Sequence, residues 1–212
     1  MKQAKNTLFL AAPWAQGLER ESPAAIAVRE WWDSAQRVYP ANTQRAWRAD
    51  WHAYEAFCRE RGLATVPAPP ATVAAFVDAC GEAGKKPATI RRYLTTVALA
   101  HRVAKFDNPC TGESVRHALK GLTNEVSSAQ RQAKGLGWER IKQFIDTAGE
   151  GLPATRERAL LCVAYDTMAR RAELVALNRG DCKFLEDGSG RALIRRSKPT
   201  RRGRAIPPTW HP

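Results

Sequence analysis

The chain has 212 residues, enough for one medium domain or two small ones, and its 44% of hydrophobic residues argues against global disorder. The formal net charge of +13 indicates a polyanionic partner, most often nucleic acid. No apolar run approaches the roughly 18 residues that cross a bilayer, and the five cysteines lack C-x-x-C spacing, so we expect no membrane association, no disulfide framework and a cytoplasmic location.

The first part of the chain divides into an irregular stretch and a helical one. Residues 1–35 have an irregular composition and predict an appendage that is only partly ordered. Over residues 36–126, apolar side chains recur at helical spacing in four segments joined by short connections, and these segments are 41–63, 71–84, 85–106 and 107–126. Four short helices with short connections predict a compact α-helical domain.

Aromatic residues form a stripe on the first of these helices. Trp47, Trp51 and Tyr54 recur at helical spacing, which favours core packing over a surface on which nucleic-acid bases stack. His101 shares an apolar face of the third helix with aliphatic residues. We therefore expect the aromatic stripe and the histidine to lie in the core.

Six cations in this helical domain stand apart from the apolar stripes. Arg45 and Arg48 lie on the first helix, and four more crowd the N-terminal end of the third helix, against its dipole. These four are Lys85, Lys86, Arg91 and Arg92. Cations at a helix start are candidate contacts for a DNA backbone. A solvated basic face explains them equally well.

A second unit follows a polar connection. Residues 127–133 are polar and basic, and they are expected to form an interdomain linker. Two helices are predicted beyond it, at 138–149 and 155–181. The second is apolar nearly all round over residues 159–165, so this segment is expected to be buried.

After Gly180 the apolar pattern changes to that of strands. Asp187 and Gly188 form a turn signal between two strand-like runs, and a third run lies at 203–207. Residues 134–212 therefore predict a helical half that leads into a small antiparallel sheet.

Three segments stand in an order that is typical of one protein family. The first is the run of four helices, the second is the helical segment that contains "RRAEL", and the third is "LIRRSKPTRRGRAIPP". In this order they resemble the tyrosine recombinase, or phage integrase, family. The family's first catalytic arginine maps to Arg170, followed by Glu173, and its hairpin lysine maps to Lys198. The resemblance covers about residues 36–208 and implies a mainly α fold: a four-helix SAM-like core-binding domain, then a partial α+β catalytic domain with a small antiparallel β-sheet.

The resemblance implies DNA strand exchange through a covalent phosphotyrosine, without a metal or other cofactor. Arg170 would grip the non-bridging oxygens of the scissile phosphate, and Glu173 would orient that arginine. Lys198 would protonate the leaving oxygen as general acid. Four arginines around the hairpin would add nonspecific, salt-sensitive attraction to phosphates, and these are Arg195, Arg196, Arg201 and Arg202.

The chain also departs from the family pattern. The glycine before the arginine motif falls at Met168 or Thr167, and the usual serine is Ala172. The family continues past its hairpin with a His-x-x-Arg box and the tyrosine nucleophile, whereas this sequence stops at Pro212 and its four tyrosines all precede the hairpin. We therefore expect a C-terminally truncated member that binds DNA without cleaving it alone. Loss of the following helices would leave apolar surface exposed on the segment 159–165.

The expected partner is double-stranded DNA, in recombination or integration. One alternative is a non-catalytic accessory or regulator that acts on DNA beside a full-length recombinase or other protomers. A basic RNA-binding protein is a second alternative, and competition between duplex DNA and RNA would separate the two classes.

Overall fold

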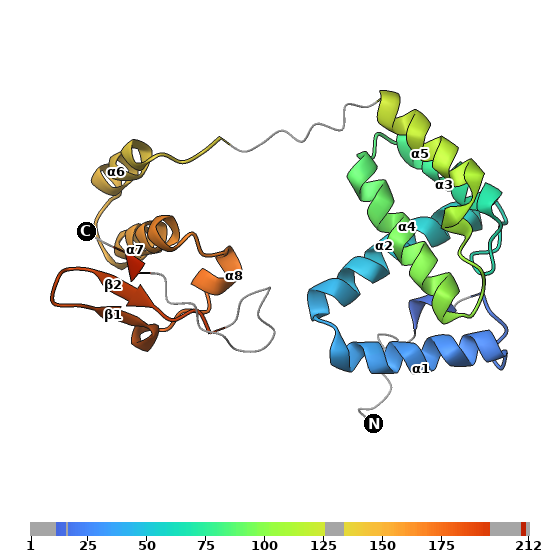
Figure 1. Cartoon of the computed structure of the whole chain (residues 1–212), viewed down its shortest axis with the longest axis horizontal. Coiled ribbons are helices and arrows are strands. Elements are labelled where there is room, and N and C mark those ends of the chain that lie inside the picture. Colours follow the sequence, from blue (N-terminus) through green and yellow to red (C-terminus); the bar gives the residue numbers. More distant parts are fainter. Residues whose placement is uncertain (1–11, 16, 126–133, 196–208, 211–212) are drawn as a thin grey trace. The chain divides into compact units, whose positions relative to one another are not determined.

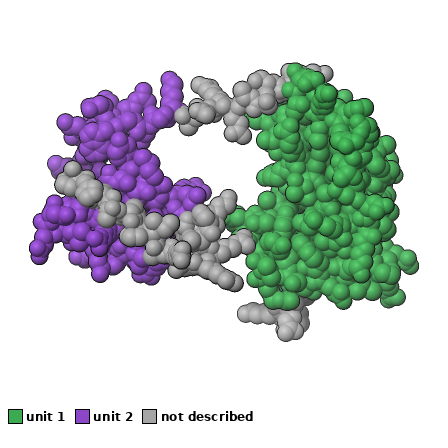
Figure 2. Space-filling view, viewed as in Figure 1, with its two compact units in different colours: residues 1–130 green, residues 131–212 purple. Residues whose placement is uncertain are grey.

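The computed structural model describes residues 12–15, 17–125, 134–195 and 209–210 (Figure 1). In this part of the chain, eight α-helices and a small antiparallel sheet agree with the mainly α class predicted from the sequence. The chain divides into two compact units, unit 1 (residues 1–130) and unit 2 (residues 131–212), which Figure 2 shows in different colours. None of the described helices is long and apolar enough to pass through a membrane.

Unit 1 consists of helices in its described part. In chain order they are η2 (Pro13–Ala15), α1 (Pro23–Val38), α2 (Ala41–Glu60), α3 (Pro70–Glu82), α4 (Pro87–Val103), η3 (Pro109–Thr111) and α5 (Glu113–Glu125). The helices α2 to α5 occupy the four segments in which apolar periodicity predicts helices. Helix α3 packs against α5, and α2 packs against α4. The pairing of α2 with α4 brings two cation-bearing helices together.

Glycines end two of these helices. Gly62 follows α2 with φ of +64°, and the Leu63 N–H donates a hydrogen bond to the Cys58 carbonyl at 2.9 Å. Gly84 follows α3 in the same conformation, with φ of +68°. Because glycine adopts positive φ without a Cβ clash, both chain reversals are set by local sequence.

The core of unit 1 is aromatic and includes the N-terminal residues. Trp14 of η2 and Trp32 of α1 are fully buried, with ring centroids 5.4 Å apart. Trp51 and Tyr54 of α2 lie in the same core, as their spacing predicts. The residues from 12 onward that were expected to form an appendage are therefore built into unit 1. Irregular composition does not reveal this, because the burial of Trp14 depends on contacts with helices distant in sequence.

His101 is a core residue that ties a loop to α4. Its Nδ1 lies 2.9 Å from the Val97 carbonyl, and its Nε2 accepts a hydrogen bond from the Ala68 N–H at 3.0 Å. The acceptor role of Nε2 requires a neutral ring that carries its proton on Nδ1. Burial lowers the pKa of His101, which favours this neutral form.

Unit 2 contains helices followed by strands. Its elements are α6 (Trp138–Thr147), α7 (Leu152–Thr167), α8 (Arg171–Leu174), η4 (Arg179–Asp181), β1 (Cys182–Phe184), β2 (Gly190–Ala192) and β3 (Thr209–Trp210). The strands form an antiparallel sheet in the order β1-β2-β3. Gly188 has φ of +81° between β1 and β2, so the predicted turn is confirmed. The third predicted run, 203–207, lies outside the described residues.

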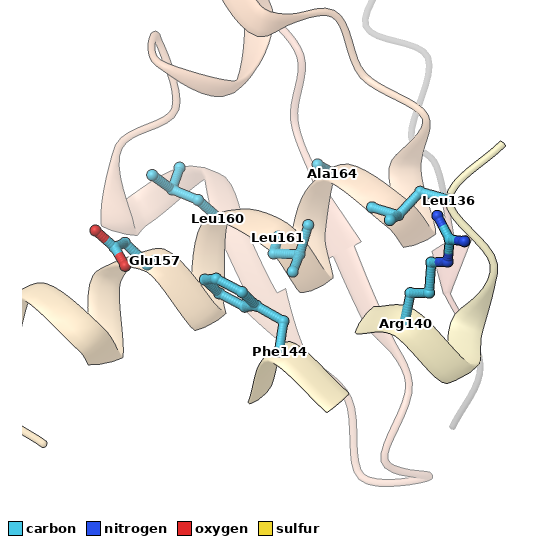
Figure 3. A pocket seen from close by; sticks show the side chains of 7 residues that line it. All are labelled: Leu136, Arg140, Phe144, Glu157, Leu160, Leu161 and Ala164. Atoms are coloured by element: carbon cyan, nitrogen blue, oxygen red, sulfur yellow. The ribbon is translucent and has the colours of Figure 1, made fainter. Parts of the chain in front are cut away.

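Helix α7 is less buried than its sequence predicts. Of its residues only Ala154 is buried, and Leu160 is 38% exposed, so the expected burial of 159–165 is wrong for the described structure. A hollow of about 570 Å³ lies between α6 and α7, with Phe144 and Leu161 pointing into it (Figure 3). The apolar surface expected on this segment is therefore present.

Candidate functional site

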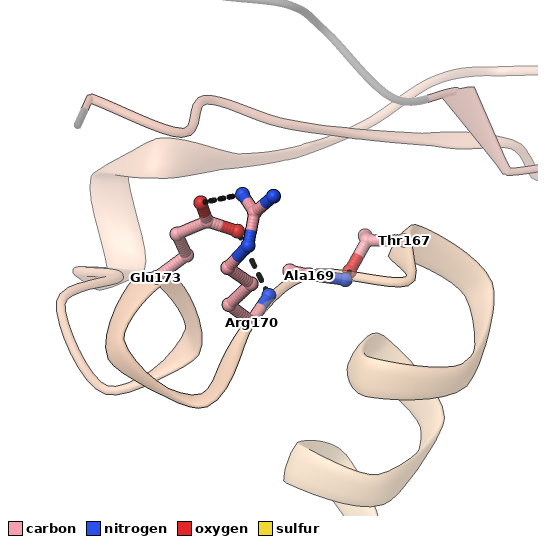
Figure 4. Close-up of polar contacts among 4 residues, drawn as sticks. All are labelled: Thr167, Ala169, Arg170 and Glu173. Atoms are coloured by element: carbon pink, nitrogen blue, oxygen red, sulfur yellow. Dashed lines mark hydrogen bonds and ion pairs between the residues drawn. The ribbon is translucent and has the colours of Figure 1, made fainter. Parts of the chain in front are cut away.

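The strongest candidate site in unit 2 begins where α7 ends. Met168 follows the helix in the left-handed region, with φ of 49°, and Arg170 then adopts an extended conformation as the N-cap of α8. The Ala169 N–H donates to the Thr167 hydroxyl at 3.3 Å, which bridges the turn (Figure 4). This sharp reversal places Arg170 at the start of a new helix instead of on the continuing face of α7.

Glu173 holds Arg170 by two contacts. Its Oε1 accepts from the Arg170 guanidinium Nη1 at 3.0 Å, and its Oε2 accepts from the Arg170 backbone N–H at 2.8 Å (Figure 4). The Glu173 side chain is 8% exposed, whereas that of Arg170 is 57% exposed. The carboxylate therefore fixes a guanidinium that faces solvent. An oriented guanidinium fork suits the planar, bidentate recognition of phosphate oxygens.

Four of the five predicted hairpin cations belong to the segment after residue 195. Lys198, Arg196, Arg201 and Arg202 lie outside the described residues. Whether the Lys198 ammonium and the Arg170 guanidinium converge stays a prediction.

Arg195 is the last described cation before that segment. Its Nε donates to Asp181 Oδ1 at 2.8 Å, and its Nη2 lies 2.6 Å from the same oxygen. The Asn178 N–H also donates to the Asp181 carboxylate, and this bond, together with Arg195, holds the pKa of Asp181 below its usual value. Arg195 therefore ties the segment that follows β2 to the end of η4, a role that cation counting did not predict.

The six candidate cations of unit 1 differ in their contacts. Arg92 of α4 lies 2.7 Å from the Asp50 carboxylate of α2. Arg48 lies over the Trp32 ring, 5.0 Å from its centroid, and Arg45 donates to the Asn42 side chain. The remaining three are exposed on or beside α4, namely Lys85, Lys86 and Arg91. The structure thus attaches Arg92 and Arg48 to neighbouring helices.

Sequence reasoning missed Asp50. The side chain is 1% exposed, and Thr96 donates to its Oδ2 at 3.1 Å. A signal was present, because Asp50 falls three residues after Trp47 and four before Tyr54, on the apolar stripe of α2. A carboxylate at such a position needs a buried partner.

Comparison with known proteins gives an informative match. No protein-family model matches the chain. Over 151 residues, or 69% of its length, the chain is 27% identical to the integrase/recombinase XerD homologue of Selenomonas ruminantium. This match supports the tyrosine recombinase family. The aligned region corresponds to 44% of that relative's length.

The recombinase resemblance and the local geometry concern the same two residues. Arg170 and Glu173 are the positions that the resemblance assigns to the recombinase arginine motif, and the structure brings them into direct contact. The position of the motif's glycine falls at or beside Met168, where φ is positive. A backbone with positive φ is a physical reason for glycine at that place.

Proposed function

We propose that this chain binds duplex DNA in site-specific recombination, through the four-helix core-binding domain within unit 1 and the Arg170 region of unit 2. The match to a XerD homologue over 69% of the chain carries this proposal. The buried Glu173 beneath a solvent-facing Arg170 agrees with a role in gripping a backbone phosphate.

The charge of α4 gives independent support. Residues 83–106 include six cations and no acidic residue. Several of these cations lie near the helix N-terminus, where they are unfavourable next to the helix dipole. A polyanion that covers this end of α4 would compensate for both the excess charge and its placement.

We further propose that these 212 residues bind DNA without forming a phosphotyrosine bond. Each of the four tyrosines packs against another aromatic ring: Tyr39 on Trp47, Tyr54 on Trp51, Tyr93 on Phe76 and Tyr165 on Trp138. Tyr54 is fully buried, and burial raises the pKa of its hydroxyl far above the usual value.

Fluorescence anisotropy with a short labelled duplex tests the binding. We expect the affinity for the duplex to fall steeply as the salt concentration rises. We also expect unlabelled duplex to displace the labelled duplex more effectively than RNA of equal length. Stronger competition by RNA would favour the basic RNA-binding alternative. No binding to duplex DNA at low salt would contradict the proposed function.

A suicide DNA substrate, which traps covalent intermediates, tests the second proposal. The expected result is no protein–DNA adduct that resists denaturing electrophoresis. An adduct that disappears when one of the four tyrosines is replaced by phenylalanine would overturn it and identify the nucleophile.

A further inference from the structure

An ion pair between a buried carboxylate and a partly exposed guanidinium joins α2 to α4. The Asp50 carboxylate is 1% exposed and receives two contacts from α4. Arg92 Nη2 lies 2.7 Å from Oδ1, and the Thr96 hydroxyl donates to Oδ2 at 3.1 Å. Because Arg92 and Thr96 are four residues apart on one helix face, they hold the carboxylate from both sides.

Stability does not explain this carboxylate well. Burial raises the pKa of Asp50, and the opposing effects of Arg92 and Thr96 are smaller. The folded protein thus favours the neutral form of Asp50 relative to an unfolded chain. The Arg92 side chain is 54% exposed and would be hydrated without any partner. A buried carboxylate that is unfavourable for folding suggests that its charge serves another purpose.

The ion pair restrains the Arg92 side chain. One end of the guanidinium is held by Asp50, and the group lies 5.7 Å from the Tyr93 ring, while much of the side chain faces solvent. An arginine restrained in this way loses less side-chain entropy when it binds. Its free N–H groups form a fork that matches phosphate oxygens.

We propose that Asp50 is a positioning residue, which holds the Arg92 guanidinium at the surface of α4 in the orientation that contacts a backbone phosphate of duplex DNA. This inference rests on the proposed function. It assigns a role in DNA binding to an acidic residue, although the negative charge of that residue by itself repels a polyanionic ligand.

The sign of that charge makes the test sharp. Asp50→Asn and Asp78→Asn each remove one negative charge, and Asp78 is an exposed residue of α3. If charge alone matters, both variants bind duplex DNA at least as tightly as the wild-type chain. If Asp50 positions Arg92, Asp50→Asn binds about three- to tenfold more weakly, the range expected for loss of one pre-ordered side chain, while Asp78→Asn does not.

Two further measurements separate positioning from unfolding. We expect the Asp50→Asn variant of the full chain to keep its helical circular dichroism and to melt at the same or a higher temperature. Arg92→Gln is expected to weaken binding as well. The double variant Asp50→Asn/Arg92→Gln is expected to bind no more weakly than Arg92→Gln alone, because Asp50 acts only through Arg92.

Thr96→Val provides a test that changes no charge. It removes the hydrogen bond to Asp50 Oδ2, and we expect it to weaken DNA binding by less than Asp50→Asn does. This test remains valid if Asp50→Asn does not fold. Unchanged binding by Thr96→Val, or tighter binding by folded Asp50→Asn, would overturn the inference even though the wild-type chain binds DNA. Failure of the wild-type chain to bind duplex DNA would instead contradict the proposed function.

Discussion

In unit 1 the largest buried side chains are aromatic and lie in one cluster, whereas in the described part of unit 2 the only buried hydrophobic residues are Ile141, Ala154 and Ala192. Unit 2 also has large apolar side chains in solvent, such as Leu152 and Phe184, each 81% exposed. Several contacts in the described part of unit 2 are polar, such as those of Arg170 with Glu173 and of Arg195 with Asp181. The comparison teaches that unit 1 is stabilised by apolar burial, while unit 2 depends more on a few buried acids and arginines.

The largest effect is expected in the aromatic core. Trp32→Ala should destabilise unit 1 by about 3–5 kcal/mol, because it leaves a cavity among packed rings. It also removes the surface on which the Arg48 guanidinium lies. The matched change in unit 2, Phe144→Ala, should cost under about 1 kcal/mol, because that ring is already 41% exposed. Urea unfolding followed by circular dichroism measures both.

An equal loss in the two variants would contradict the comparison. Unit 2 would then hold a packed core of its own, and polar contacts would no longer be its main support.

A smaller effect is expected from a polar contact in unit 2. Arg158 of α7 donates its Nε to the Ile145 carbonyl at 3.1 Å and its Nη2 to the Ala148 carbonyl, so it satisfies groups at the end of α6. Arg158→Ala should destabilise unit 2 by about 1–2 kcal/mol. Arg156→Ala, an exposed change on the same helix, should stay within about 0.5 kcal/mol. Comparable losses would show that Arg158 contributes only its charge.

The two units should also respond to acid in different pH ranges. In unit 1 the pKa of His101 is lowered, so an unfolded chain takes up this proton first, at about pH 6.5. The contribution of neutral His101 to the free energy of unfolding is fully present above this pH. It is lost as the pH falls toward the pKa of His101 in the folded protein, by up to about 1.4 kcal/mol per pH unit. Urea midpoints of unit 1 at several pH values measure the slope, which His101→Gln should remove.

Asp181 supplies the contrast in unit 2. Its pKa is lowered, so its contribution to stability is present above the ordinary aspartate value of about 3.9 and is lost only as pH falls below it. A pH at which unit 1 is weakened and the Asp181 contacts persist should therefore exist. Loss of stability in both units at the same pH would show that other groups control the acid response.

The sequence predicts the parts of this fold that depend on neighbouring residues. Helices α2 to α5 follow from periodicity, the end of α2 follows from Gly62, and the hairpin turn follows from Asp187 and Gly188. Burial of Trp14 was not predictable, because it depends on what packs against this residue from elsewhere in the chain.

The candidate site shows the same division between local and distant contacts. Glu173 lies three residues from Arg170, so their contact could be anticipated. Asp50 and Arg92 are 42 positions apart, and Asp181 and Arg195 are 14 apart, and only the folded chain pairs them. Counting cations treated Arg92 and Arg195 as unattached side chains, whereas each contacts a buried carboxylate.

The smallest expected effect concerns the turn before Arg170. Met168 has φ of 49°, which costs a non-glycine residue roughly 1–2 kcal/mol. Met168→Gly removes this strain but gives the unfolded chain more freedom, worth about 0.5–1 kcal/mol, so unit 2 should change little or gain slightly in stability. Met168→Val should lose about 1 kcal/mol, because a β-branched side chain fits this conformation poorly. Urea midpoints should place Met168→Gly at or above the wild-type chain and Met168→Val below it. This order would connect the backbone at residue 168 with the glycine of the recombinase motif. Equal midpoints for Met168→Val and the wild-type chain would show that residue 168 does not hold this conformation in solution.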